Sequence, residues 1–345
     1  MASPSPKTLF ALPATDLDHV LLHASADLEE LRGRSFFITG GTGFFGKWLL
    51  ASLGYANAEL GLGLRLTVLS RDPGKFLELH PEVGEVEALE FLCGNANDFP
   101  FTESRYDYIL HAATETLGIA TPEQEEARLR SIVEGTRRVL ELARHCGARR
   151  LLNFSSGGVY GAAAGKVSGT TEDDYAEAIP LTYYARGKRE AEALCEQSGV
   201  DFTTARGFAF VGPYLALDAH YAIGNFLRDA LRGGPIQVRG DGTALRSYLH
   251  TADLVVWLLR ILVKGRRGRA YNVGSDEAVS TAELARRVAQ AVHPAPEVVV
   301  QSLQPQGPQN IYLPDLRRVR TELGLDVVIR LDEAIARTLV FLNCS

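Results

Sequence analysis

The sequence predicts an α/β protein with a doubly wound parallel sheet and a smaller C-terminal lobe. Short apolar runs alternate with amphipathic stretches through the N-terminal part of the chain, which is typical of parallel strands joined by right-handed helical crossovers. A glycine-rich turn follows the first apolar run. After residue 212 this alternation gives way to Gly and Pro clusters, which indicates a second, less regular lobe.

The expected elements follow in chain order. A mixed polar and apolar pattern predicts a helix over residues 16–31 that packs on the outside of the protein. The expected strands are residues 35–39, 64–70, 89–93, 106–112, 150–155, 201–208 and 269–273. The expected helices beyond the first strand are residues 44–54, 123–146, 183–198, 281–292 and 331–342.

Length and composition exclude several classes of protein. The 345 residues are 46% hydrophobic and 23% charged, as in an ordinary globular protein with a large core. The net charge of −6 disfavours a nucleic-acid partner and an anionic membrane. The longest apolar run, 254–263, is too short to cross a bilayer and is interrupted by Arg260. The four cysteines are too far apart for a metal or redox pair, so we expect a cytoplasmic protein without a metal site.

The glycine-rich turn is the first candidate site. Glycines at the Gly-x-x-Gly-x-x-Gly spacing between a strand and a helix let backbone N–H groups approach a pyrophosphate at the helix N-terminus. We therefore expect a Rossmann-type dinucleotide site at this turn, formed by Gly40, Thr42, Gly43, Phe44, Phe45 and Gly46. The chain then divides into an N-terminal helical extension (1–33), a dinucleotide-binding domain (34–211, with return segments near 245–273) and a mainly substrate-binding lobe (212–345).

The end of the second expected strand bears on the choice of cofactor. A carboxylate there would bind the ribose 2′-OH, but Ser70 stands in its place and Arg71 can pair with a 2′-phosphate. The sequence therefore favours NADP(H) over NAD(H). In the alternative interpretation, Arg71 stacks on the adenine or faces water, and Asp72 reaches the ribose.

A tyrosine and a lysine indicate the chemistry. Tyr184 and Lys188 are four residues apart on one expected helix, so they share a face. A neighbouring ammonium lowers the pKa of a phenol from its usual value of about 10, and Ser156 at the end of the fifth strand can hold the substrate oxygen. We expect Ser156, Tyr184 and Lys188 to be the catalytic residues of a hydride transfer in which Tyr184 exchanges a proton with that oxygen. Lys188 would also bond the nicotinamide ribose; a chance pair on a surface helix is the alternative.

These residues together resemble the extended short-chain dehydrogenase/reductase superfamily, in its branch of nucleotide-sugar epimerases, dehydratases and reductases. The resemblance runs from about residue 34 to the C-terminus and includes the segments 155–161 and 240–249. It implies that Asn95, Ala96, Ala112 and Ala113 line the cofactor, with Tyr184 and Lys188 also contacting it. It further implies a homodimer formed through helices 123–146 and 183–198.

The same resemblance assigns two residues to the substrate. Arg246 would contact the nucleotide diphosphate; an internal ion pair with Asp241 or Asp253 is the alternative. Ala209 stands where the family often has an Asn that touches the substrate phosphate, so Asn225 is a candidate to supply that contact.

A departure from the family pattern narrows the reaction. Gly157 and Gly158 stand where similar dehydratases carry an Asp-Glu pair and decarboxylating relatives carry a Glu, and two glycines can act neither as acid nor as base. Glu115 could reach the site, although a loop carboxylate that faces solvent is the simpler interpretation. Hydride transfer at sugar C4 without elimination therefore remains.

Four functions fit these observations. The first is an NADPH-dependent reductase of a 4-keto-deoxy nucleotide sugar, and the second is a nucleotide-sugar 4-epimerase. A non-catalytic dinucleotide sensor is disfavoured because Ser156, Tyr184 and Lys188 are all present. A ketoreductase of a non-sugar substrate is disfavoured by Arg246 and the long C-terminal lobe.

Overall fold

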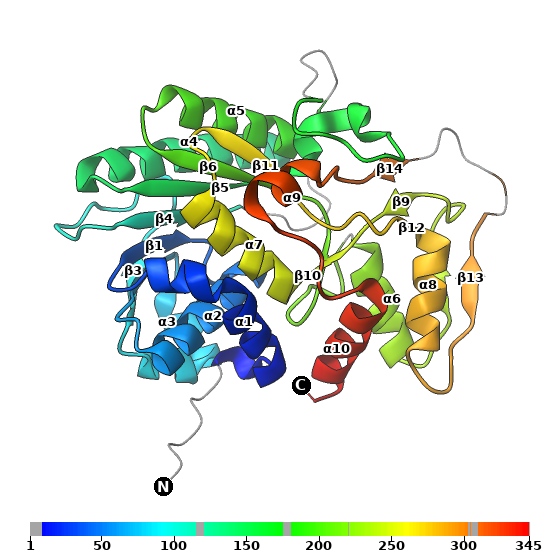
Figure 1. Cartoon of the computed structure of the whole chain (residues 1–345). Helices are drawn as coiled ribbons and strands as arrows, with labels where there is room; N and C mark the ends of the chain where they lie inside the picture. The colour runs from blue at the N-terminus through cyan, green and yellow to red at the C-terminus, as the bar shows by residue number, and fades with distance from the viewer. Residues whose placement is uncertain are drawn as a thin grey trace, which may run out of the picture.

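The computed structural model of the chain describes residues 9–114, 121–174, 181–219, 221–302, 304 and 310–344, without the side chains of residues 162–164. Its centre is a seven-stranded parallel sheet with helices on both faces (Figure 1). The strands are β1 (Ser35–Thr39), β2 (Arg65–Ser70), β3 (Leu89–Cys93), β4 (Tyr108–His111), β5 (Arg150–Ser156), β6 (Phe202–Gly207) and β11 (Arg269–Val273). The α/β fold and all seven expected strands are confirmed.

The strand order creates a ligand-binding crevice. The sheet runs β11-β6-β5-β4-β1-β2-β3, so the chain moves outward from β1 to β3 and then returns to β4 on the other side of β1. Thr39 at the end of β1 pairs in register with His111 at the end of β4. In open parallel sheets, ligands bind at the carboxyl ends of the strands where the order reverses. Here that point lies between β1 and β4.

The helices cover the two faces of the sheet in separate groups. Helices α4 (Pro122–Cys146) and α5 (Tyr183–Gln197) pack against each other on one face. On the other face lie α2 (Phe44–Leu60), α7 (Thr251–Lys264) and α1 (Ala14–Glu30), with α1 against both of its neighbours (Figure 1). Helix α7 was not among the expected helices. It is buried over almost its whole circumference.

Helix α1 is more deeply integrated than an outside position implies. Asp27 pairs with Arg260 of α7 at 2.6 Å, and Asp16 pairs with Arg337 of α10 (Leu331–Cys344) at 2.5 Å. Both carboxylates are fully buried. The expectation that this helix packs only on the outside is therefore corrected: its polar positions bind it to the C-terminal part of the chain.

The C-terminal lobe is built from short elements. Two of its helices, α8 (Thr281–Gln290) and α10, match expected helices, whereas α6 (Ala222–Leu231) and α9 (Arg317–Leu323) were not expected. Its strands form small sheets in which β9 (Leu245–Arg246) lies between β12 (Val279–Ser280) and β14 (Ile311–Tyr312). The remaining elements are η1 (Leu9–Ala11), α3 (Pro73–Leu79), η2 (Pro81–Glu85), η3 (Gly157–Ala164), β7 (Phe210–Val211), β8 (Ile236–Val238), β10 (Leu249–His250) and β13 (Val298–Val300). Within the described ranges, none of the helices combines the length and apolarity that a bilayer crossing needs.

Candidate active site

The turn between β1 and α2 is built around two glycines that admit no side chain. Gly40 has a φ of +75°, and a Cβ there would lie 2.7 Å from the carbonyl carbon of Ala112. A Cβ on Gly46 would lie 2.2 Å from the carbonyl oxygen of Gly40. The turn therefore packs directly against the end of β4 and the first turn of α2, and the backbone itself forms the surface of the crevice.

The N-terminus of α2 fits an anionic group. Gly43 is its N-cap and has no side chain that could accept from the first N–H groups of the helix. Uncapped N–H groups and the helix dipole together favour a phosphate. Thr42 and Phe44 are half-buried at this terminus, whereas the ring of Phe45 packs between Phe154 and Phe210 in the core. The backbone N–H groups around Phe45 can thus face the cofactor, while the Phe45 ring packs against other aromatic side chains.

The end of β4 is held against the end of β1. The backbone N–H of Ala112 donates to the carbonyl oxygen of Thr39 at 3.2 Å, and that of Ala113 donates to the Thr39 hydroxyl at 3.1 Å. His111 hydrogen-bonds Thr39 through one ring nitrogen and Thr136 through the other, at 2.8 and 3.1 Å. Burial, and secondarily the charge of Lys188, lowers the pKa of His111 to about 3, so its imidazole is neutral. Its two hydrogen bonds hold the end of β4 against β1 and α4.

The ends of β2 and β3 lie on the other side of the turn. Ser70 is buried, and Arg71 is exposed. The carboxylate of Asp72 accepts from the backbone N–H of Lys75 at 2.9 Å and caps α3. In the alternative interpretation Asp72 reaches the ribose, but here its carboxylate is engaged at a helix N-terminus. Asn95 is exposed in the turn after β3.

Close packing brings α4 against the turn after β3. A Cβ on Gly135 would lie 3.3 Å from the Cβ of Ala96 and 3.2 Å from the side-chain oxygen of Asn97. That oxygen is buried and has no hydrogen-bond partner among the residues that the structure describes. Ala96 therefore packs against α4, beside an unsatisfied acceptor.

Lys188 lies buried at the end of β5. Its ammonium donates to the carbonyl oxygen of Phe154 at 2.8 Å and to the hydroxyl of Thr114 at 2.7 Å. Burial lowers its pKa to about 8, and the more distant charge of Glu192 only partly opposes this. The lysine is thus fixed in position by two uncharged acceptors.

The phenol of Tyr184 lies near the hydroxyl of Ser156. Burial raises the pKa of Tyr184 to about 12, and the neighbouring Ser156 works in the opposite direction. The expectation that Lys188 lowers this pKa is therefore wrong for the structure as it stands. The ammonium lies 5.9 Å from the centre of the Tyr184 ring and is bonded to other groups, so the phenol is protonated at neutral pH.

One helical turn further along α5, Glu192 belongs to a buried polar network. It accepts from the hydroxyl of Ser155 at 2.5 Å and pairs with Arg206 of β6 at 2.7 Å. Arg206 also donates to the hydroxyl of Tyr160 and to the backbone carbonyl of Glu172, both at 3.0 Å. Sequence analysis did not identify this network, although the spacing of Glu192 from Lys188 places both on the same helix face.

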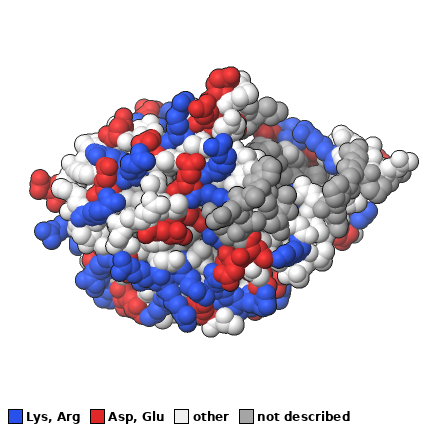
Figure 2. Space-filling view, turned by 90° about the horizontal axis from the view of Figure 1, so that it is seen from above, with Lys and Arg blue, Asp and Glu red and all other residues white. Residues whose placement is uncertain are grey.

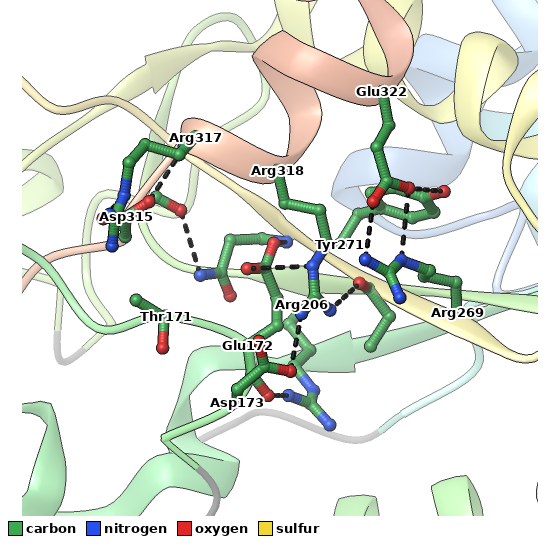
Figure 3. Close-up of polar contacts among 12 residues, drawn as sticks. Thr171, Glu172, Asp173, Arg206, Arg269, Tyr271, Asp315, Arg317, Arg318 and Glu322 are labelled. Carbon is green, nitrogen blue, oxygen red and sulfur yellow. Dashed lines mark hydrogen bonds and ion pairs between the residues drawn. The ribbon is translucent and has the colours of Figure 1, made fainter.

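The network continues toward α9. Arg318 pairs with Asp173 at 2.6 Å and with Glu172 at 3.5 Å. Figure 3 shows the side chains of Arg206, Glu172, Asp173 and Arg318 converging from β6, from the segment before residue 175 and from α9. Helix α5 is thereby connected through ion pairs and hydrogen bonds to the C-terminal part of the chain.

Arg246 lies on the C-terminal side of the crevice. It donates to the backbone carbonyls of Leu245 and Asn310 at 2.8 and 3.0 Å. The alternative ion pair with Asp253 does not form, because Asp253 bonds His19 at 2.7 Å. The guanidinium carbon of Arg246 also lies 5.7 Å from the ring centre of Tyr312, its partner in the β9–β14 pairing.

Tyr312 is a residue that sequence analysis missed. Its hydroxyl lies near Ser156 and Tyr184, and both of them affect its pKa. A Cβ on Gly157 would lie 2.7 Å from that hydroxyl and 2.9 Å from the ring of Phe208. No local pattern marks Tyr312, because only the pairing of β14 with β9 brings it to this place.

Asn225 lies apart from this group. With Phe226, Gln237 and Thr281 it lines a cavity of about 630 Å³ between α6 and the small β8 sheet. Its amide nitrogen donates to the carbonyl oxygen of Ala219, and its amide oxygen accepts from Arg228, both at 3.1 Å. Neither the catalytic residues nor Arg246 line that cavity. Glu115 lies outside the described residues.

Known proteins match both the sequence and the fold. The family model described as "NAD dependent epimerase/dehydratase family" matches residues 36–274. The chain is 29% identical to UDP-glucuronic acid decarboxylase 6 of Arabidopsis thaliana, over 88% of this chain and 90% of that protein. It is 24% identical to dTDP-glucose 4,6-dehydratase of Streptomyces niveus, over 87% of this chain and 90% of that protein.

Solved structures agree on the fold. UDP-glucose 4-epimerase of Thermotoga maritima, determined with UDP-glucose, superposes with a TM-score of 0.75 at 20% identity, covering 90% of this chain and 99% of that one. A dTDP-glucose 4,6-dehydratase of Streptomyces venezuelae, determined with NAD, gives a TM-score of 0.70 at 23% identity, covering 90% and 97%.

Proposed function

The chain belongs to the NAD-dependent epimerase/dehydratase family and is an enzyme of the short-chain dehydrogenase/reductase type, and from this premise we propose that it transfers hydride at C4 of a nucleoside-diphosphate sugar without eliminating water or carbon dioxide. One observation carries the proposal. Ser156, Tyr184 and Lys188 converge at the end of β5, while the neighbouring position 157 is a glycine. The volume that an acidic side chain would need there holds the hydroxyl of Tyr312 and the ring of Phe208.

The crevice residues fit a dinucleotide. The backbone of the glycine turn would hold the pyrophosphate, because Gly40 and Gly46 leave no room for side chains and the α2 N-terminus is uncapped. The backbone of Ala112 and Ala113 would lie beside it, and Lys188 would bond the nicotinamide ribose. The cofactor, when bound, supplies or accepts the hydride.

Arg71 supports the reductive direction, because it favours NADPH, which is a dissociable reductant. Tyr184, which is protonated at neutral pH, would donate a proton to the carbonyl oxygen as hydride arrives at the carbon. Ser156 would hold the same oxygen by a hydrogen bond. We therefore propose a 4-keto-deoxy nucleotide-sugar reductase first. A 4-epimerase would use the same three residues in both directions.

Turnover with and without added cofactor tests this choice. The purified enzyme is offered UDP-, GDP-, CDP- and dTDP-sugars, with and without a partner dehydratase that forms the 4-keto sugar, and the products are read by mass spectrometry. A reductase converts the 4-keto sugar only when a reduced dinucleotide is added in stoichiometric amount. Turnover of a nucleoside-diphosphate hexose without added cofactor would instead establish the epimerase.

NADP(H) is the proposed cofactor because Arg71 is exposed after β2 while Asp72 caps α3. Arg71→Ala should weaken NADPH binding about tenfold or more and leave NADH binding nearly unchanged, since a guanidinium pairs with the 2′-phosphate. Arg65→Ala, which removes the same charge at the opposite end of β2, is the matched control. Equal effects of Arg71→Ala on NADPH and NADH binding would contradict the proposed preference for NADP(H).

The substrate contacts remain proposals. Arg246 would bind the diphosphate, with its guanidinium oriented by the carbonyls of Leu245 and Asn310. Asn225, in the cavity beside α6, would contact the nucleotide part of the substrate. Titration of the Arg246→Leu variant with a nucleoside diphosphate, followed by calorimetry, should show weaker binding than in the wild type. An unchanged affinity would contradict the proposed contact between Arg246 and the diphosphate.

We also propose a homodimer formed through α4 and α5. Figure 2 views the molecule from above, the side on which these two helices lie in Figure 1, and shows acidic and basic side chains interspersed there. Ion pairs within α4, such as Arg130 with Glu126 and Arg137 with Glu134, neutralise part of this charge. Sedimentation equilibrium measures the oligomeric state, and a monomer at micromolar concentration would contradict this proposal.

A further inference from the structure

The C-terminal lobe brings a second phenol to the catalytic serine. Tyr312 ends β14 and pairs in register with Arg246 of β9. Its hydroxyl lies beside the start of η3: a Cβ on Gly157 would lie 2.7 Å from it, and a Cβ on Gly158 would lie 3.3 Å from the hydroxyl oxygen of Ser156. Ser156 affects the pKa of both Tyr312 and Tyr184. Three hydroxyl groups, two from the sheet domain and one from the C-terminal lobe, therefore meet at the point where the reacting oxygen would bind.

Packing fixes the direction of the Tyr312 side chain. Its ring lies 4.7 Å from the ring of Phe208, at an angle of 38°. The guanidinium of Arg246 lies on the ring at 5.7 Å from its centre. A ring held by neighbours of this kind has little rotational freedom, so its hydroxyl is pre-organised at Ser156. Tyr312 as a residue keeps part of its surface exposed.

Tyr312 also fills the volume beside Gly157. A side chain at position 157 would begin 2.7 Å from the Tyr312 hydroxyl. The two positions are therefore mutually exclusive: this chain places a neutral phenol where a residue at 157 would place its own functional group. Burial raises the pKa of Tyr312 above the usual value for tyrosine, so it stays protonated and donates a hydrogen bond.

We propose that Tyr312 contacts the substrate and determines its specificity, donating a hydrogen bond to a hydroxyl of the sugar ring next to the reacting carbon while Ser156 and Tyr184 hold the reacting oxygen. This inference rests on the proposed hydride transfer at a sugar C4. It assigns Tyr312 no proton transfer, which stays with Tyr184.

The test compares Tyr312→Phe with the wild type on the nucleoside-diphosphate sugar that the screen identifies. Phenylalanine keeps the ring between Phe208 and Arg246 and removes only the hydroxyl. We expect kcat/KM to fall about tenfold while dinucleotide affinity, measured by fluorescence titration, stays unchanged. Tyr183→Phe, an exposed tyrosine on the same helix as Tyr184, is the matched control and should behave like the wild type.

Substrates that lack one hydroxyl separate a direct contact from a structural role. In the wild type, the deoxy analogue that lacks the contacted hydroxyl should lose about tenfold in kcat/KM, because the phenol is left without its acceptor. In Tyr312→Phe the same analogue and its parent should react at nearly equal rates. An equal loss in both enzymes for every analogue, or full activity of Tyr312→Phe, would overturn the inference.

Failure of the proposed function gives a different result. If the wild type converts no nucleoside-diphosphate sugar, with or without dinucleotide, then the hydride-transfer proposal fails, and the assignment of Tyr312 to a sugar hydroxyl falls with it. If the wild type converts such a sugar and only the comparison with Tyr312→Phe shows no difference, the function stands and the role of Tyr312 alone is refuted.

Discussion

Helix α5 buries two charged side chains one turn apart, and their surroundings differ sharply. Lys188 donates to two uncharged oxygens, and burial lowers its pKa to about 8. Glu192 pairs with Arg206 at 2.7 Å, and both side chains are less than a tenth exposed. Burial alone would lower the pKa of Arg206, but the charge of Glu192 outweighs it and raises that pKa above the usual value.

The difference separates a turn whose buried charge has a countercharge from a turn whose buried charge has none. A buried charge with a full countercharge is stable in its ionised form and serves to fix the structure. A buried lysine held only by neutral oxygens is destabilised and responds readily to a ligand that changes the local charge. The Tyr184–Lys188 turn contains a lysine of this second kind. The Glu192 turn contains a buried charge with a full countercharge, and Glu192 also accepts a hydrogen bond from Ser155, the residue before Ser156.

The largest effect is expected at Tyr184. Tyr184→Phe should reduce kcat by about a thousandfold, because the proton donor is lost from the site. Dinucleotide affinity and the free energy of unfolding should change little, since the ring remains. Stopped-flow or steady-state rates at saturating cofactor measure kcat, and fluorescence titration measures dinucleotide affinity. Retained turnover would place the chemistry elsewhere on the helix.

The next effect concerns stability at the Glu192 turn. Arg206→Met should reduce the free energy of unfolding by about 3 kcal/mol or more, because it leaves the Glu192 carboxylate buried without a countercharge. Urea unfolding measures the loss. Arg137→Met, which removes one partner of a half-exposed pair, should cost less than about 1 kcal/mol.

A double variant sharpens this result. Glu192→Gln combined with Arg206→Met removes both charges, so its loss should be smaller than the sum of the two single losses. Strict additivity would mean that the two side chains do not act as a pair, and the contrast with Lys188 would lose its basis.

The smallest effect is the pH dependence at Lys188. Because its folded pKa, about 8, lies below the unfolded value of about 10.4, the charged form is disfavoured in the folded protein. Below pH 8 the lysine is protonated in both states and destabilises the fold by about 3 kcal/mol, from a difference of about 2.4 pKa units. As the pH rises from about 8 to about 10.4, the folded protein binds fewer protons than the unfolded chain, and this penalty disappears.

Lys188→Met should therefore unfold at a higher urea concentration than the wild type at pH 7, and the difference should shrink by pH 10. Subtracting the two proteins cancels the titration of other groups. Lys75→Met, at an exposed position, is the control and should show no such trend. A wild type that is the more stable protein at pH 7 would show that the bonds to Phe154 and Thr114 outweigh the burial of the charge.

Local patterns were sufficient for much of the fold. Each sheet strand is a short apolar run, and the glycine turn, Ser156 and the Tyr184–Lys188 pair depend on residues within a few positions of one another. Helix α7 was not predicted, although its apolar side chains recur with a helical period. The expected effect of Lys188 on the pKa of Tyr184 failed because spacing along a helix does not say where an ammonium finds its acceptors.

The sequence by itself determined the parallel sheet and the glycine turn, and it predicts the three proposed catalytic side chains, because these follow from contacts between near neighbours in the chain. Only the tertiary structure decided that Tyr312 meets Ser156, that Arg206 neutralises Glu192, and that α1 joins the C-terminal helices. Such contacts join segments distant in sequence, and their geometry is set by how β14 pairs with β9 and how helices pack on the sheet.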